Sequence, residues 1–264
     1  MLKSFDEGRV FGHFRAGTGP LCVLLHGWAR DSSDLAPLAA LLEEKGLPTL
    51  RLDLPGFGAS PPPDSPWDSA DYAAAVCRVI AEASGRQSGA DTVVVVGHSF
   101  GGRVALQIAA MSPCPAAAVV VTGVPLFRRR SGAKPPIAYR MARWASRRGL
   151  LGEARMEEFR RRYGSEDYRR ASGVMRDIFV KVVNEDYTAQ LNAISIPLQL
   201  VWGSADSAAP VEQAQRAASM VKNSTLTVLE GRDHFGPIAM PAGLAAAVEE
   251  AVSRIDAADR EEKG

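Results

Sequence analysis

The sequence is poor in features that would place it in a secreted, metal-binding or membrane class. Only three cysteines occur in 264 residues, Cys22, Cys77 and Cys114, and they are too scattered for a disulfide framework or a zinc site. Its apolar runs are no longer than a β-strand, and residues 1–20 contain charges and no apolar core. We therefore expect a cytoplasmic protein with no signal peptide and no stable membrane association.

An excess of charge of one sign is also missing. The chain has 31 Lys plus Arg against 30 Asp plus Glu, a formal net charge of +1. This balance gives no reason to expect a nucleic acid as partner. No metal-ligand cluster, phosphate loop or dinucleotide fingerprint stands out, so no cofactor and no metal are expected. We expect a small molecule as the partner, and the sequence does not indicate an oligomeric state.

Short apolar runs alternate with amphipathic segments along most of the chain. The strand-like runs are Leu21–Leu25, Pro48–Leu54, Thr92–Val96, Ala117–Val121, Pro197–Trp202 and Thr225–Leu229. The helical segments are Asp31–Glu44, Asp68–Ala83, Phe100–Met111, Val211–Val221 and Ala242–Ile255. This alternation predicts an α/β fold with a mostly parallel sheet and helices on both of its faces. Arg9–Ala16 is expected to form antiparallel edge strands.

Residues 125–190 interrupt the alternation. They contain helical patterns and no buried-strand pattern, and residues 126–190 carry a charge of +8. We predict a core domain of residues 1–124 and 191–264, with residues 125–190 as a helical cap over the carboxyl edge of the sheet. The charge could steer an anionic substrate or an acidic partner, although most of these side chains are expected to be solvated.

The sequence Gly97-His-Ser-Phe-Gly101 follows a predicted buried strand and begins a predicted helix. A turn this sharp requires small residues at Gly97 and Gly101, and it projects Ser99 from the edge of the sheet. Backbone N–H groups at the start of the helix are available to an oxyanion. Ser99 is therefore the predicted nucleophile.

A serine hydroxyl needs a general base, and a base needs a carboxylate that orients it. His234 follows the last predicted strand, and Asp206 follows the strand before it, so both should lie at the same edge as Ser99. Asp206 could instead be a turn or capping residue. The remaining histidines suit structural roles: His13 in the edge strands, His26 as a loop organiser, and His98 packed beside the turn with its side chain directed away.

Two N–H donors are expected to complete the site. One is Phe100, directly after the nucleophile, and the other is Trp28 in the loop His26-Gly27-Trp28. The Trp28 indole could also form a wall of the pocket, or it could only pack.

Together these segments resemble α/β-hydrolase fold serine hydrolases of the esterase and lipase-like group. The segments that carry the resemblance are His26–Trp28, Asp53–Ser60, Gly97–Gly102, Gly203–Asp206 and Gly231–His234. The resemblance implies a helical cap inserted before the last two strands. It also implies that Ser99 attacks a carbonyl, that His234 accepts its proton, and that an acyl-enzyme forms.

Several residues are candidates for contact with substrate. Arg103 lies four residues after Ser99, and a similar arginine faces a carboxylated substrate in a resembling menaquinone-pathway synthase; here it could equally pair with a loop carboxylate. The other candidates are Trp28, Phe127, Trp144 and Phe235.

The leading prediction is hydrolysis of a carboxylic ester or thioester of a small to medium substrate. A C–C bond hydrolase or a menaquinone-synthase-like lyase with a carboxylated substrate is the alternative, followed by a non-catalytic small-molecule binding protein. Haloalkane dehalogenases and epoxide hydrolases carry Asp where this chain has Ser99, so they fit less well.

Overall fold

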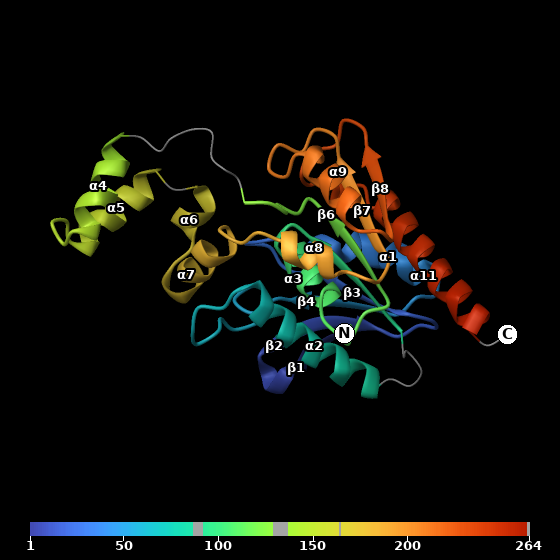
Figure 1. The fold of residues 1–264 in the computed structure, drawn as a ribbon. Helices are drawn as coiled ribbons and strands as arrows, with labels where there is room; N and C mark the ends of the chain where they lie inside the picture. The colour runs from blue at the N-terminus through green and yellow to red at the C-terminus, as the bar shows by residue number, and fades with distance from the viewer. Residues whose placement is uncertain (87–91, 129–136, 164, 263–264) are drawn as a thin grey trace.

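The computed structural model describes residues 1–86, 92–128, 137–163 and 165–262, and these contain an eight-stranded sheet (Figure 1). Its spatial order is β1-β2-β4-β3-β5-β6-β7-β8. The strands are β1 (Leu2–Phe5), β2 (Val10–Arg15), β3 (Leu21–Leu25), β4 (Thr49–Asp53), β5 (Val93–His98), β6 (Ala118–Thr122), β7 (Leu198–Gly203) and β8 (Ser224–Leu229). The pairs β1–β2 and β2–β4 are antiparallel, and the other pairs are parallel. The predicted mostly parallel sheet is confirmed.

Helices cover both faces of the sheet (Figure 1). One face is covered by α1 (Ala36–Glu44) and α11 (Ala242–Glu262), with the short α10 (Gly236–Ala239) and the turn η2 (Ser32–Leu35) beside them. The other is covered by α2 (Ser69–Arg86), α3 (Phe100–Ala109), α8 (Thr188–Ala193) and α9 (Val211–Met220). No described helix is long and apolar enough to cross a lipid bilayer.

Alternation along the central strands explains this two-sided burial. Val93 and Val95 of β5 pack into the cluster beneath α2 and α3, whereas Val94 and Val96 pack into the cluster beneath α1 and α11. Successive strand side chains point to opposite faces, so a strand between two helical layers must be apolar at every position.

The chain between β6 and β7 forms a helical insertion. We use this name for α4 (Ile137–Arg147), α5 (Glu153–Tyr163), α6 (Glu166–Arg170) and α7 (Gly173–Val182). The next helix, α8, returns to the sheet and buries Leu191 in its core. The predicted boundary between cap and core, after residue 190, falls inside α8, and the division into core and cap remains a prediction. Residues 129–136 of the predicted cap lie outside the described residues.

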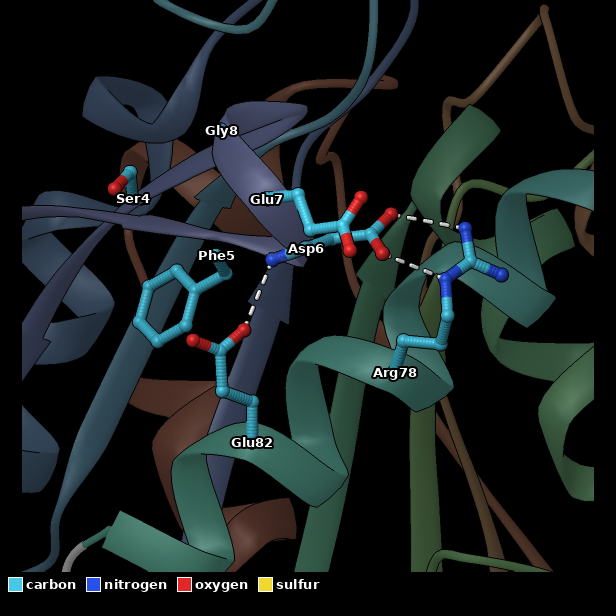
Figure 2. A pocket seen from close by; sticks show the side chains of 7 residues that line it. All are labelled: Ser4, Phe5, Asp6, Glu7, Gly8, Arg78 and Glu82. Carbon is cyan, nitrogen blue, oxygen red and sulfur yellow. Dashed lines mark hydrogen bonds and ion pairs between the residues drawn. The ribbon is translucent and has the colours of Figure 1, made fainter.

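The turn between β1 and β2 contains the 3-10 helix η1 (Asp6–Gly8) and is bound to α2 (Figure 2). Arg78 donates from Nε and Nη2 to the two carboxylate oxygens of Asp6, at 2.7 and 2.9 Å, and Glu82 accepts the Asp6 N–H at 2.9 Å. The hydrogen bonds from Arg78 lower the pKa of Asp6. The cavity of about 630 Å³ at this turn contains none of the predicted catalytic residues, so we assign the turn a structural role.

The junction of β5 and α3 is packed backbone against backbone. A Cβ at Gly101 would overlap the carbonyl oxygen of Leu25, and a Cβ at Gly97 would lie 2.5 Å from the carbonyl oxygen of Gly101. Both contacts involve main-chain atoms, which cannot rotate away as a side chain can.

We expect Gly101→Ala to lower the free energy of unfolding by about 3 kcal/mol, since the added methyl group must displace a central strand. Gly152→Ala is the matched control, because no atom lies within 4 Å of its Cβ position. Urea denaturation followed by circular dichroism measures both. Equal midpoints for the two variants would contradict the close packing.

Candidate active site

The three predicted catalytic residues come together at the carboxyl edge of the sheet. Ser99 lies between β5 and α3, Asp206 follows β7, and His234 follows β8. His234 Nδ1 is 2.8 Å from Asp206 Oδ2. Ser99 and His234 line one cavity of about 770 Å³.

Asp206 is buried and held as an acceptor. Its Oδ1 accepts the N–H groups of Ala208 and Ala209 at 2.9 and 2.8 Å, and the Trp202 indole donates to the Ala209 carbonyl oxygen at 2.6 Å. Burial alone would raise the pKa of Asp206, but the hydrogen bonds from His234 and the two N–H groups outweigh burial, so the pKa is lowered. A charged Asp206 accepts the His234 Nδ1–H and leaves Nε2 free to take a proton.

Ser99 has a backbone conformation that a serine rarely adopts, with φ 49° and ψ −107°. Its N–H donates to the Thr122 carbonyl oxygen at 2.9 Å, which holds the turn. Such strain persists where the surrounding structure enforces it, and it is concentrated at functional sites. The next residue, Phe100, begins α3, so Ser99 lies at the positive end of a helix dipole.

The two loops that carry the predicted oxyanion donors are joined directly. Gly101 N–H donates to the His26 carbonyl oxygen at 2.9 Å. The rings of Trp28 and Phe100 meet edge to face, with centroids 5.3 Å apart. Neither the Trp28 nor the Phe100 N–H donates to another group in the described part of the chain. The assignment of both as oxyanion donors stays a prediction.

His26 and Asp53 organise the loops behind these donors. His26 is fully buried; its Nε2 accepts the Leu54 N–H at 3.0 Å, and its Nδ1 lies 2.7 Å from the Gly27 carbonyl oxygen. Asp53 accepts the Ser32 N–H at 2.8 Å. Burial lowers the pKa of His26, so the ring stays neutral and can accept from Leu54. This agrees with a structural role for both residues.

His98 lies closer to the site than the sequence indicated. Its Nε2 is 3.1 Å from the His234 carbonyl oxygen, and the two rings are 4.9 Å apart. Burial, reinforced by the nearby His234, lowers the pKa of His98 to about 3, so Nε2–H of a neutral ring is the donor. The buried position of His98 beside the turn agrees with the packing role expected for it, and the contact with His234 is one that the sequence did not indicate.

Three of the five candidates for substrate contact line the cavity, namely Trp28, Arg103 and Phe235. Phe127 and Trp144 do not. Phe127 lies beneath the guanidinium of Arg216, 3.9 Å from its ring centroid. Trp144 is on α4, which packs against α5, and its side chain is half exposed. Aromatic character alone did not indicate which way these helices face.

The apolar wall that faces Ser99 comes from α7. Phe179, Val182 and Val183 line the cavity, and the Phe179 ring lies 5.1 Å from that of Trp28. None of the three was among the five predicted substrate contacts. Their spacing at positions i, i+3 and i+4 places them on one helix face and could have indicated them.

Arg103 is bound to the insertion. Its side chain is buried, Nη1 donates to the Val182 carbonyl oxygen at 2.5 Å, and Nη1 lies 3.9 Å from Glu185 Oε2. Its guanidinium lies 5.5 Å from the Tyr187 ring centroid. The pairing with a loop carboxylate, one of the two alternatives for Arg103, is the arrangement found.

The other arginines of the cavity are also paired. Arg30 donates to both carboxylate oxygens of Asp34 at 2.5 and 2.6 Å, and Arg170 contacts Glu166 at 2.5 Å. In the described residues, no three His, Cys, Asp or Glu side chains are grouped to hold a metal ion. The cavity thus offers a serine, a histidine that is hydrogen-bonded to Asp206, and apolar walls.

Replacement of Arg103 by alanine should lower the free energy of unfolding by about 3 kcal/mol, because the Val182 carbonyl and Glu185 lose their buried partner. The exposed Arg143→Ala should change it by less than about 0.5 kcal/mol. Chemical denaturation of both variants measures this. Equal stability of the two would show that the Arg103 contacts contribute nothing.

Comparison with known proteins adds to this geometry. The chain is 26% identical over 241 residues to the pimeloyl-[acyl-carrier protein] methyl ester esterase of Pseudoalteromonas atlantica, covering 83% of this chain and 88% of that protein. It is 31% identical over 112 residues to the 2-(acetamidomethylene)succinate hydrolase of Mesorhizobium japonicum, which covers 42% of this chain and 38% of that enzyme.

Solved structures share the fold. A thermophilic esterase from Thermogutta terrifontis superposes with a TM-score of 0.67 at 20% identity, covering 97% of this chain and 99% of that one. A bromoperoxidase from Bacillus anthracis gives 0.71 at 18% identity, covering 96% and 100%. The model of the Alpha/beta hydrolase family matches residues 22–247. This match covers most of the chain, and the strand order and the serine turn agree with it. The chain therefore belongs to the alpha/beta hydrolase family.

Proposed function

We propose that the protein is a serine hydrolase that cleaves a carboxylic ester or thioester through an acyl-enzyme on Ser99. One observation carries the proposal: His234, which is hydrogen-bonded to the buried Asp206, lines the same cavity as a strained Ser99 at a helix N-terminus. These are the parts that nucleophilic acyl transfer requires.

In the first half-reaction, Ser99 Oγ attacks the substrate carbonyl carbon and its proton passes to His234 Nε2. The charged Asp206 stabilises the imidazolium that forms, and its lowered pKa keeps it ionised. Collapse of the tetrahedral intermediate transfers the proton to the leaving alcohol or thiol. Water then attacks the acyl-enzyme with His234 as base, and the acid is released.

The developing oxyanion is bound by the N–H groups of Trp28 and Phe100. The hydrogen bond from Gly101 to His26 sets the spacing of the two loops before substrate arrives. Donors preorganised in this way are worth about 3 kcal/mol each in transition-state stabilisation.

The walls of the cavity favour an uncharged acyl group. Trp28, Phe179 and Val182 supply apolar surface, and the volume of about 770 Å³ accommodates a small to medium substrate. Arg30, Arg103 and Arg170 each contact a carboxylate of the protein, so none is free to bind a substrate carboxylate. An ester whose acyl or alcohol part is attached to a carrier protein, as the name of the Pseudoalteromonas relative indicates for that enzyme, is compatible with this arrangement.

The alternative, a C–C bond hydrolase or lyase with a carboxylated substrate, depends on Arg103 as the anion-binding residue. Its bond to Val182 and its contact with Glu185 oppose that role. A purely binding protein would have no need of a strained Ser99 beside an oriented histidine. The name of the Mesorhizobium relative indicates a carboxylated substrate for that enzyme, and this supports the first alternative over the shorter part of the chain that matches it.

We expect a fluorophosphonate probe to label the wild-type protein with one adduct per chain, as measured by intact mass, because an activated serine attacks phosphorus as it attacks a carbonyl. Ser99→Ala should remain unlabelled while retaining the wild-type circular dichroism spectrum. Absence of labelling in a folded wild-type protein would contradict the proposed function.

Asp206→Asn should reduce kcat for a p-nitrophenyl ester by about 10³ to 10⁴-fold, because an amide no longer holds the His234 Nδ1–H tautomer. The control is Asp233→Asn, whose carboxylate accepts the N–H groups of Phe235 and Gly236 and lies next to His234 in the chain. That variant should stay within about threefold of wild type. Steady-state kinetics measures kcat for both variants. Equal losses of kcat would contradict the assignment of Asp206 as the residue that orients His234.

A further inference from the structure

The net positive charge of the segment between β6 and β7 comes from its first part. Residues 125–152 contain eight Lys or Arg and no Asp or Glu, whereas residues 153–190 contain eight of each. Within the described residues, and apart from Arg128, this charge lies on α4 and the turn that follows it. We call the face made by Arg140, Met141, Arg143, Trp144, Arg147, Arg148 and Leu150 the α4 surface.

The arginines of the α4 surface differ from four of those in the rest of the insertion. Arg160, Arg161, Arg170 and Arg176 each contact a glutamate. In contrast, the structure gives the arginines of the α4 surface no carboxylate contact within the described residues. The Arg148 guanidinium lies 4.4 Å from the ring centroid of Trp144 instead. Their charge is therefore available to an external anion.

Large apolar side chains lie among these arginines. Met141 is 65% exposed, Trp144 50% and Leu150 70%. Met141, Trp144 and Arg148 follow one another at helical spacing along one side of α4, and the opposite side packs on α5 through the buried Ala142. Figure 1 shows α4 and α5 at the outer end of the insertion, away from the sheet.

We propose that the α4 surface binds the surface of an anionic lipid bilayer, peripherally and reversibly. A helix with arginines beside exposed Trp, Met and Leu suits the interface, where the arginines meet lipid phosphates and the apolar side chains enter between headgroups. Each arginine near an anionic membrane contributes about fivefold to binding. None of its residues lines any of the three described cavities.

This inference goes beyond the proposed function and does not depend on it. The α4 surface contains no residue of the Ser99 cavity. It also agrees with the expectation of no stable membrane association, because binding of this type is reversed by salt.

The test uses the full chain and sedimentation with vesicles of phosphatidylcholine, with or without an equal amount of phosphatidylglycerol. We expect binding to the anionic vesicles at about 50 mM salt and its loss at about 500 mM salt. Arg143→Glu/Arg147→Glu should weaken binding at least about tenfold. The control Arg161→Glu/Arg254→Glu makes the same change of charge at exposed arginines of α5 and α11 and should weaken it less than about threefold.

A second readout is tryptophan emission, which should shift to shorter wavelength when anionic vesicles are added and should not shift in Trp144→Phe. Circular dichroism of every variant confirms that the fold is retained, and fluorophosphonate labelling reports on the proposed function separately. The proposal is overturned by equal binding to neutral vesicles, by no binding to anionic vesicles, or by equal effects of the two double variants. It is also overturned if the α4 surface binds poly-glutamate, as an acidic protein surface would, and not the vesicles.

Discussion

Close packing of backbone on backbone at the turn between β5 and α3 is the constraint on which the site depends. Gly97 and Gly101 let the strand, the turn and the loop after β3 approach to contact distance. The hydrogen bond from Gly101 to His26 then joins the two loops that carry the predicted oxyanion donors. The same turn forces Ser99 into its strained conformation, so one local geometry places the proposed nucleophile and the proposed donors.

The second half of the site comes from strands that are distant in the chain. The carboxyl ends of β7 and β8 lie at the same edge of the sheet as those of β5 and β6, because these four strands are parallel. Asp206 is fixed there by two backbone donors, and it orients His234. His98 supports the arrangement from the nucleophile side, because its bond to the His234 carbonyl connects the end of β5 to the loop after β8.

The arginines in the segment between β6 and β7 have two different roles. Near the cavity, arginines are neutralised by carboxylates and hold structure, as Arg103 does between α3 and the insertion. On α4 they are exposed beside Trp144 and Met141. The net charge of the whole segment does not show this separation. It led to the expectation that most of these side chains are solvated, whereas the pairing of each arginine depends on helix packing.

The sequence by itself determined the alternation of buried strands and helices, the glycine turn around Ser99, and the order of Ser99, Asp206 and His234, because each follows from local residue spacing. Only the tertiary structure decided that His98 meets His234, that α7 faces the cavity, and that Phe127 and Trp144 do not. These features depend on how helices of the insertion pack on one another and on the core. Helix packing is decided by contacts between segments far apart in the chain, and amphipathic patterning indicates that a face is buried without indicating its partner.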